Sequence, residues 1–444
     1  MAEETVRLAE YAAGLGFRDL PAEVVKKAKD AIADTAAAAI CGSALPWSRI
    51  LVDYAVTNAA AGKSRVLGPG FPAVTAPAAA LANGGLAHAF ELDSLTRPGA
   101  GVHPGASLLP PALAIAQQQG AGGRALIAAF VAGAETMVRI GRATFHSNEE
   151  RGFHAPGTTG PFGAAVAAGH LLGIGAKEMA NALGIAGSLA AGLLEFAARQ
   201  RGGMVKRLHL GRACESGVLA ATLAGRGFRA PDTILEGRFG FLSVFCERSD
   251  AALLTKALGE EFLTLTTVFK RYPCHITAHA PLKALQELRS EHGFSPEEIE
   301  SIQVFGSERM ASRHNIPEPA DLMLAQYSVP FCLALSLYRD PREPGAFDEA
   351  ALTDPKIRGL ARRVTLSARP PGSAEGAMAA TVRVDLKGGR TLERHEADGL
   401  LPPADLGDKF LRLTRPTLGK GAEALFERLR HLDEEETLDW LGRF

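Results

Sequence analysis

The chain has 444 residues, more than a single hydrophobic core usually organises, so we expect more than one structural unit. Its 48 basic and 49 acidic residues give a formal net charge of -1, and no basic stripe with interleaved aromatic residues occurs. This balance gives no support to nucleic-acid binding. Small molecules and other copies of the chain are the expected partners.

Cysteine spacing and the amino terminus favour a cytoplasmic protein. The five cysteines are widely spread, without the spacing of a metal or cluster site, and reduced thiols fit the cytoplasm best. The chain begins Met-Ala-Glu-Glu, without the features of a secretory signal. Three stretches without charged residues, 66–90, 98–123 and 152–176, are long enough to span a membrane. Their prolines, glycines and polar residues predict buried segments of a soluble protein instead.

The first 265 residues show mostly helical spacing. Between Pro21 and Gly42 apolar residues recur with the period of a helix. Small residues let helix backbones approach closely, so we expect a packed array in which several helices are buried on most sides. The same spacing predicts helices over 110–119, 124–145, 160–172, 177–199 and 215–225.

The pattern changes after about residue 265. Segments 300–305 and 364–367 are predicted strands, and an alternating run, 381–386, meets 390–394 across Lys387-Gly388-Gly389, as in a hairpin. These segments predict a smaller α+β unit over 266–395.

Helical spacing returns from residue 404 and includes 422–432. The final segment is therefore expected to pack on the helical half. Residues 1–265 and 396–444 then form one helical domain, and the α+β unit is an insertion between them.

Between residues 66 and 123 the chain has three charged side chains, Glu91, Asp93 and Arg97, with His88 and His103 on either side of them. Charge is costly in an apolar setting unless it is paired or used. Carboxylates close to imidazoles offer proton donors and acceptors whose pKa values burial can tune. The alternative is structural: carboxylates that cap helices and a histidine that bonds to backbone in the core.

Three further groups contain imidazole side chains, and two of them also contain basic residues. His154 lies in a Gly- and Pro-rich turn ahead of a predicted helix, where an N-terminus favours an anion; a structural loop histidine is the alternative. Lys206 belongs to a basic run that suits a substrate with several carboxylates, unless the run is a solvated face. Lys270 and His275 lie at the expected entry to the α+β unit, in a cationic segment able to close over a ligand; a polar linker is the alternative.

Together these groups resemble the MmgE/PrpD family. The matching runs are His-x-x-Glu-x-Asp with His-Pro-Gly-Ala, Gly-Phe-His-x-Pro, Lys-x-Leu-His-x-Gly-Arg-Ala and Lys-x-Tyr-Pro-x-His, in the family's order and approximate spacing. The family includes 2-methylcitrate dehydratase, cis-aconitate decarboxylase and iminodisuccinate epimerase. The resemblance implies a mainly α protein: a large helical domain from both chain ends, an inserted α+β lid, a cleft between them, a homodimer, and no metal or organic cofactor.

The resemblance also implies roles for individual residues. Glu91 and Asp93 match the paired acids, and His103 and His154 match the proton-transferring histidines. Lys206, Lys270 and His275 match groups that face substrate carboxylates, and Tyr327 matches a tyrosine near the cleft. The run from Glu91 to Arg97 departs from the family's commoner Asp-x-Asp-Asp, and Arg97 is an added candidate for carboxylate binding.

These assignments predict a cofactor-independent lyase. Fixed cations would stabilise negative charge that develops beside a substrate carboxylate, while a histidine moves a proton at carbon. A hydro-lyase acting on a methylcitrate-like hydroxy acid is the leading prediction. An epimerase or a decarboxylase of a small di- or tricarboxylate is the alternative within the same chemistry, and a non-catalytic helical ligand-binding protein is the alternative of another class.

Overall fold

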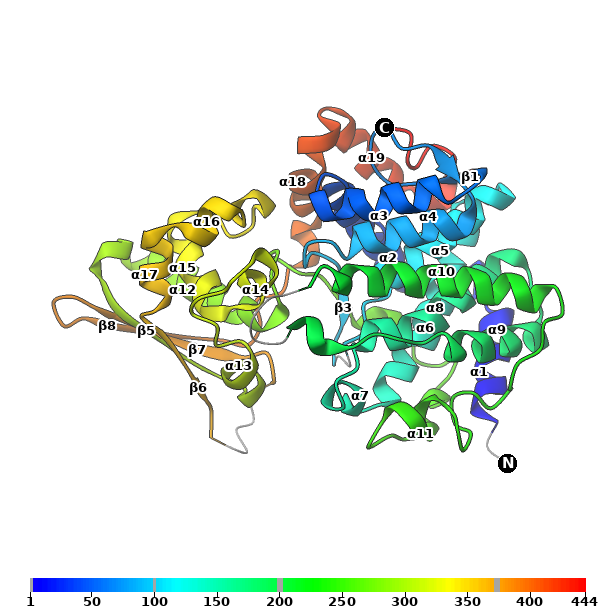
Figure 1. Ribbon diagram of the computed structural model, residues 1–444, viewed down its shortest axis with the longest axis horizontal. Helices are drawn as coiled ribbons and strands as arrows, with labels where there is room; N and C mark the ends of the chain where they lie inside the picture. Colours follow the sequence, from blue (N-terminus) through cyan, green and yellow to red (C-terminus); the bar gives the residue numbers. More distant parts are fainter. Residues whose placement is uncertain (1–2, 99–100, 198–202, 371–375) are drawn as a thin grey trace.

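The computed structural model describes residues 3–98, 101–197, 203–370 and 376–444. The protein is mainly α-helical, as predicted. In Figure 1 a larger helical body lies on the right and a smaller body, built around a sheet, lies on the left. The helices of the larger body are α1 (Glu4–Gly14), α2 (Ala22–Ser43), α3 (Pro46–Thr57), α4 (Ala76–Ala87), α5 (Pro104–Gln119), α6 (Gly123–Ala143), α7 (Ser147–Glu150), α8 (Ala155–Leu172), α9 (Ala176–Ser188), α10 (Val205–Gly225), α11 (Phe241–Phe245), α18 (Leu406–Leu418) and α19 (Gly421–Arg430).

The smaller body contains the remaining α-helices and a mixed four-stranded sheet. Its helices are α12 (His279–His292), α13 (Glu308–Arg313), α14 (Leu322–Tyr327), α15 (Val329–Tyr338), α16 (Glu349–Thr353) and α17 (Pro355–Ala361). Its strands are β5 (Ile299–Gly306), β6 (Val364–Ala368), β7 (Ala380–Leu386) and β8 (Thr391–Glu396), in the order β6-β5-β7-β8. Two short pairs lie outside this sheet: β1 (Ala61–Arg65) with β2 (Ala73–Val74), and β3 (Leu95–Thr96) with β4 (Thr267–Val268).

The four strands predicted from the sequence are confirmed, and so is the hairpin. β7 and β8 pair antiparallel, and Gly388 and Gly389 adopt positive φ angles of 105° and 85° in the turn between them. Left-handed backbone of this kind favours glycine. β5 pairs with β6 in parallel and with β7 antiparallel. Helices α12 and α15 cover one face of the sheet (Figure 1).

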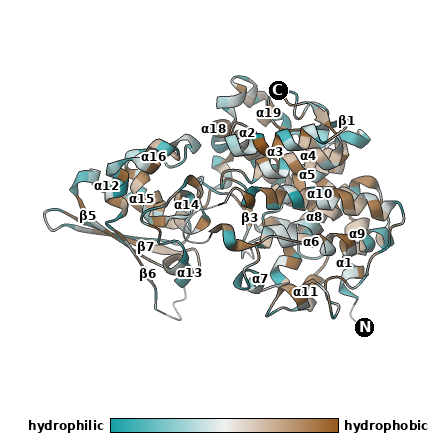
Figure 2. Cartoon of the chain, in the orientation of Figure 1, coloured by the Kyte–Doolittle hydropathy of each residue, from teal (hydrophilic) through white to brown (hydrophobic). Residues whose placement is uncertain are grey.

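Small residues hold the helical body together. Along α10, Gly217 packs so closely on α8 that an added Cβ would lie 2.3 Å from the Ala164 Cβ and 2.5 Å from its carbonyl carbon. Hydrophobic residues run along α8 and α10 in Figure 2, as expected of helices that are buried on several sides. The Ala- and Gly-rich composition thus gives close helix contacts.

The last helices pack against the first ones. α18 lies on α2, where the buried Lys409 ammonium forms an ion pair with Asp34 and donates to the Leu92 carbonyl at 2.8 Å. The Gln117 amide donates to the carbonyls of Leu438 and Leu441 at 2.9 and 2.8 Å. Segments from the two ends of the chain therefore lie side by side, as Figure 1 shows in blue and red.

Several predicted helix boundaries were wrong. The helix predicted over 177–199 ends at Ser188, because the following chain turns to hydrogen-bond with the start of α8; residues 198 and 199 lie outside the described ranges. The helices predicted from residues 110, 160 and 215 begin earlier, at Pro104, Ala155 and Val205. Proline is favoured in a first helical turn, and Pro110, Pro111 and Pro161 are tolerated inside buried helices.

No described helix alone has the length and hydropathy of a membrane span. The bent pair α2 and α3 passes that test only when the two helices are taken together, and only by length and composition.

Replacement of Gly217 by alanine tests the close packing of α10 on α8. The added methyl group meets Ala164 and its backbone, so we expect the free energy of unfolding to fall by about 1–3 kcal/mol. Gly14→Ala is the matched control, because its added methyl group would meet no atom within 4 Å, and we expect little change. Urea-denaturation midpoints measure both. Equal midpoints for Gly217→Ala and the wild type would show that the two helices do not constrain each other.

Candidate active site

Short strands position the acidic segment between the two bodies. The chain leaves α4 at His88, and Glu91 takes a left-handed conformation with φ of 57°. β3 then pairs antiparallel with β4, which matches Leu95 with Val268. This pairing brings residues 88–97 alongside the segment that carries Lys270.

Glu91 accepts contacts from two buried lysines. The Lys270 ammonium lies 2.9 Å from Glu91 Oε2, and the Lys206 ammonium forms an ion pair with Oε1. All three residues are at most 4% exposed. Burial, together with the charges of Lys270 and Arg207, lowers the pKa of Lys206 well below its ordinary value, and burial also lowers the pKa of Lys270. One carboxylate serves two ammonium groups, so the cluster favours a further anion.

Asp93 is fully buried and holds two imidazoles. His88 Nδ1 lies 2.9 Å and His103 Nδ1 lies 2.8 Å from the same oxygen, Asp93 Oδ2. Burial acts to raise the pKa of Asp93, but both histidines outweigh it and hold the pKa well below its ordinary value. Burial lowers the pKa of His88 to about 3, although Asp93 opposes this. His103 has the more exposed side chain, 13% against 0% for His88, so it is the imidazole better placed to meet a ligand.

A second imidazole pair lies beside the first. His154 Nδ1 and His209 Nδ1 are 3.0 Å apart, and the His154 and His88 ring centroids are 5.9 Å apart. Burial and the charges of His88 and His209 lower the pKa of His154 well below its ordinary value. Phe196 contacts the rings of both His154 and His209. His154 is therefore a neutral imidazole in an apolar setting, able to accept or return a proton.

Three helices of the larger body begin at this site. His103 precedes the first residue of α5, His154 precedes that of α8, and Lys206 is the second residue of α10. These helices pack on one another, so their N-termini point to one region. A helix N-terminus offers unpaired N–H groups and a partial positive charge, which adds to the preference for an anion.

The smaller body contributes an aromatic wall. His275 stacks on His314 with ring centroids 4.2 Å apart and lies 4.7 Å from the Tyr327 ring. The Lys206 ammonium lies 5.2 Å from the centre of the Tyr327 ring, so this wall touches the lysine cluster. Burial, with His314 and nearby cations, lowers the pKa of His275 well below its ordinary value, and burial lowers the pKa of His314 to about 4.

The structure thus gathers eight of the nine residues singled out from the sequence, and it places Arg97 differently. Arg97 forms an ion pair with Asp398 at 2.6 Å, and its side chain is 36% exposed. The sequence motifs contained His88 and His209 without giving them a role, and they gave no signal for Phe196 or His314. Nothing in the local sequence of Phe196 or His314 indicates which distant segment it will meet.

His88, Asp93 and His103 are the one described group of histidines and acids whose ligand atoms all lie within 4.8 Å of one another. Two imidazole nitrogens and a carboxylate oxygen are ligand types that bind a transition metal such as zinc. However, both Nδ1 atoms already share Asp93 Oδ2 through hydrogen bonds, and a metal would have to replace both of them. The arrangement thus orients His103 without a metal.

Two family models match the chain: the MmgE/PrpD N-terminal domain over residues 6–254 and the MmgE/PrpD C-terminal domain over residues 272–434. A cis-aconitate decarboxylase from Aspergillus terreus is 30% identical over 416 residues, which cover 87% of this chain and 83% of that protein. The human cis-aconitate decarboxylase is 27% identical over 369 residues, which cover 80% of this chain and 75% of that protein.

The buried neutral imidazoles predict how stability depends on pH. A histidine whose pKa is lower in the folded chain takes up a proton on unfolding, so stability is lost as pH falls below the unfolded value. For His88 that window extends from 6.5 to about 3. Between pH 6.5 and 4.5, His88→Gln should lose roughly 2–3 kcal/mol less unfolding free energy than the wild type.

Urea denaturation at a series of pH values measures this difference. Glutamine keeps a donor for Asp93, and His292→Gln, at an exposed position, is the matched control. The same pH slope for His88→Gln and the wild type would mean that His88 is not held neutral.

Proposed function

The chain belongs to the MmgE/PrpD family, and we propose that it is a lyase that removes carbon dioxide from a small unsaturated polycarboxylate. The observation that carries this proposal is the pair of buried lysines, Lys206 and Lys270, that share the Glu91 carboxylate beside the imidazole of His103. The relatives are cis-aconitate decarboxylases, and their activity supplies the substrate class.

Binding uses the two lysines that share one carboxylate. One substrate carboxylate meets Lys206 and Lys270, and the N-termini of α5, α8 and α10 favour the same charge. His275 and Tyr327 line the opposite side. These groups are already in place, so negative charge that develops on the substrate costs little reorganisation.

The chemical step needs one proton. The bond between the departing carboxylate and its carbon breaks, and its electron pair forms a new carbon–carbon double bond. The electron pair of the old double bond then takes a proton at the carbon next to a retained carboxylate. Asp93 holds a hydrogen on Nδ1 of His103, so His103 as the imidazolium gives this proton from Nε2 and becomes a neutral imidazole. His103 regains a proton from solvent before the next turnover, and the neutral imidazole of His154 relays that proton.

This proposal reverses the order of the predicted activities. Dehydration of a methylcitrate-like acid was placed first on the sequence alone, whereas the relatives have the names of decarboxylases. Dehydration and epimerisation use the same residues, because both also pass through charge beside a carboxylate. The assay described below therefore distinguishes decarboxylation, dehydration and epimerisation.

The domain arrangement completes the proposal. We propose that residues 1–265 with 396–444 form the base and that 266–395 form a lid. The ion pair between Arg97 and Asp398 then lies within the base and ties the returning chain, just after the lid, to the acidic segment. The homodimer implied by the family stays a prediction, which sedimentation velocity of the purified chain tests.

Proton NMR in deuterated water tests the reaction. With cis-aconitate we expect a new alkene, one deuterium on the protonated carbon and release of carbon dioxide. Water loss from 2-methylcitrate would identify a hydro-lyase, and exchange without a new alkene would identify an epimerase. If no acid of a broad polycarboxylate panel is turned over, the chain is a binding protein and the proposal fails.

Replacement of His103 by asparagine should lower kcat by about 100- to 10,000-fold, the usual contribution of one positioned proton transfer. The melting temperature and substrate affinity should change little, because asparagine can still donate to Asp93. His431→Asn, at an exposed position on the surface, is the matched control and should retain full activity. Wild-type kcat for His103→Asn would assign proton transfer to another residue.

A further inference from the structure

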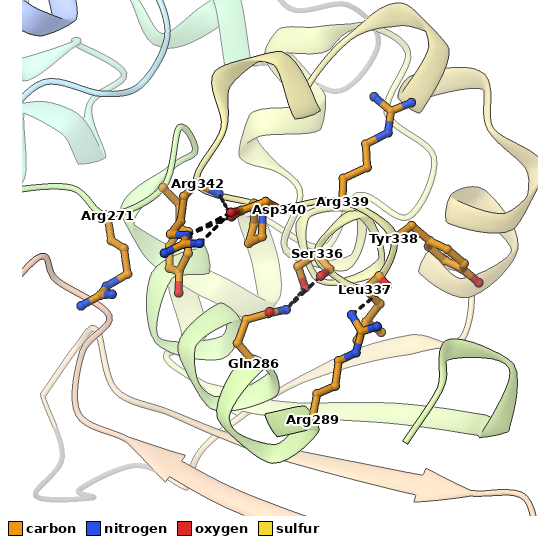
Figure 3. Close-up of a pocket in the computed structure, with 11 residues that line it drawn as sticks. Arg271, Gln286, Arg289, Ser336, Leu337, Tyr338, Arg339, Asp340 and Arg342 are labelled. Atoms are coloured by element: carbon orange, nitrogen blue, oxygen red, sulfur yellow. Dashed lines mark hydrogen bonds and ion pairs between the residues drawn. The ribbon is translucent and has the colours of Figure 1, made fainter. Parts of the chain in front are cut away.

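A hollow of about 440 Å³ lies outside the candidate active site, on the smaller body. It is lined by the end of α15 and the loop that follows, by α12, and by Arg271 and Tyr272. Figure 3 shows arginines reaching this region from three segments: Arg271, Arg289 of α12, and Arg342 of the loop. The volume is within the range of small-molecule sites, about 300–1,000 Å³.

The charges around the hollow do not balance. Among the described residues, four arginines line it, and Asp340 is the one lining carboxylate. Arg342 neutralises Asp340, because it contacts both carboxylate oxygens of that residue. Arg339 forms an ion pair with Asp348, outside the lining. Arg289 and Arg271 are therefore the two lining arginines without a close ion pair to any carboxylate that the structure describes.

Both of these guanidinium groups have N–H donors without a hydrogen-bond partner in the described chain. Arg289 donates to the Leu337 carbonyl at 2.9 Å and forms no ion pair with a described carboxylate. Arg271 reaches Asp405 only at 3.4 Å, and its buried Nε has no hydrogen-bond partner in the described chain. The Tyr272 hydroxyl adds a donor without a partner among the described residues, and the Gln286 amide is held by Ser336. Guanidinium groups with unused donors suit oxyanions of phosphate or carboxylate.

We propose that this hollow binds a small oxyanion with at least two negative charges, held by Arg271 and Arg289 and assisted by Tyr272. Pyrophosphate groups and tricarboxylates share this chemistry. The site is distinct from the lysine cluster, yet Arg271 directly follows Lys270, which contacts Glu91. An anion bound by Arg271 therefore contacts the residue that follows Lys270 of the candidate active site.

Isothermal titration calorimetry of the full chain tests the proposal, with pyrophosphate and citrate as separate probes at fixed ionic strength. We expect one or both to bind, with affinity at least tenfold weaker in Arg271→Gln and in Arg289→Gln. The tighter probe shows whether phosphate or carboxylate oxygens are preferred. Arg430→Gln, on the exposed surface of α19, is the matched control and should bind like the wild type.

Lys206→Met separates this site from the active site, since it should leave unchanged the binding that depends on Arg271 and Arg289. The proposal is overturned if neither probe binds, if Arg271→Gln and Arg289→Gln bind like the wild type, or if Lys206→Met alone removes binding. Thermal melts of each variant confirm that it is folded. Because two independent arginine variants are used, the misfolding of one does not prevent the test.

Discussion

The shared carboxylate of Glu91 is the contact on which the rest of the site depends. A buried ammonium group is costly without a partner, and here two of them meet one acid. The chain brings them together from three segments, by a left-handed turn at Glu91, by the β3–β4 pairing, and by the first turn of α10. Two lysines that face one carboxylate are both fully charged only when a further anion is present, so the fold itself creates a preference for an anionic ligand.

The packing of the helical body makes this cluster possible. Glycines such as Gly217 let α8 and α10 approach closely, which aligns their N-termini with that of α5. The three helix starts then surround Asp93 and its imidazoles with partial positive charge. Burial keeps His88 and His154 neutral, while Asp93 orients His103, the more exposed of its two imidazoles. Anion binding and proton transfer are thus separate tasks of neighbouring groups.

Local patterns in the sequence predicted the elements that local physics determines. The alternation in 381–386 and the glycines at 388 and 389 were sufficient for the hairpin, because period and turn chemistry are both local. The start of α10 was missed, because in its first turn the basic residues Lys206 and Arg207 are buried by tertiary contacts while the apolar Val205 and Leu208 are exposed. The four sequence motifs contained every gathered residue except Tyr327, but not the side chains that surround them. Phe196 enters only through the fold, and the Arg97 side chain pairs with Asp398, 301 positions away.

The most direct test of the central claim is the number of protons that the protein takes up when it binds an anion. Calorimetric titration with tricarballylate, a saturated tricarboxylate that cannot be decarboxylated in the same way, is repeated between pH 7 and 9 in buffers of different ionisation enthalpy. If Lys206 lacks a full counter-charge in the free protein, a bound carboxylate raises its pKa again, and up to one proton is taken up per ligand. That uptake should disappear in Lys206→Met. Tight binding without any proton uptake in the wild type would contradict the account.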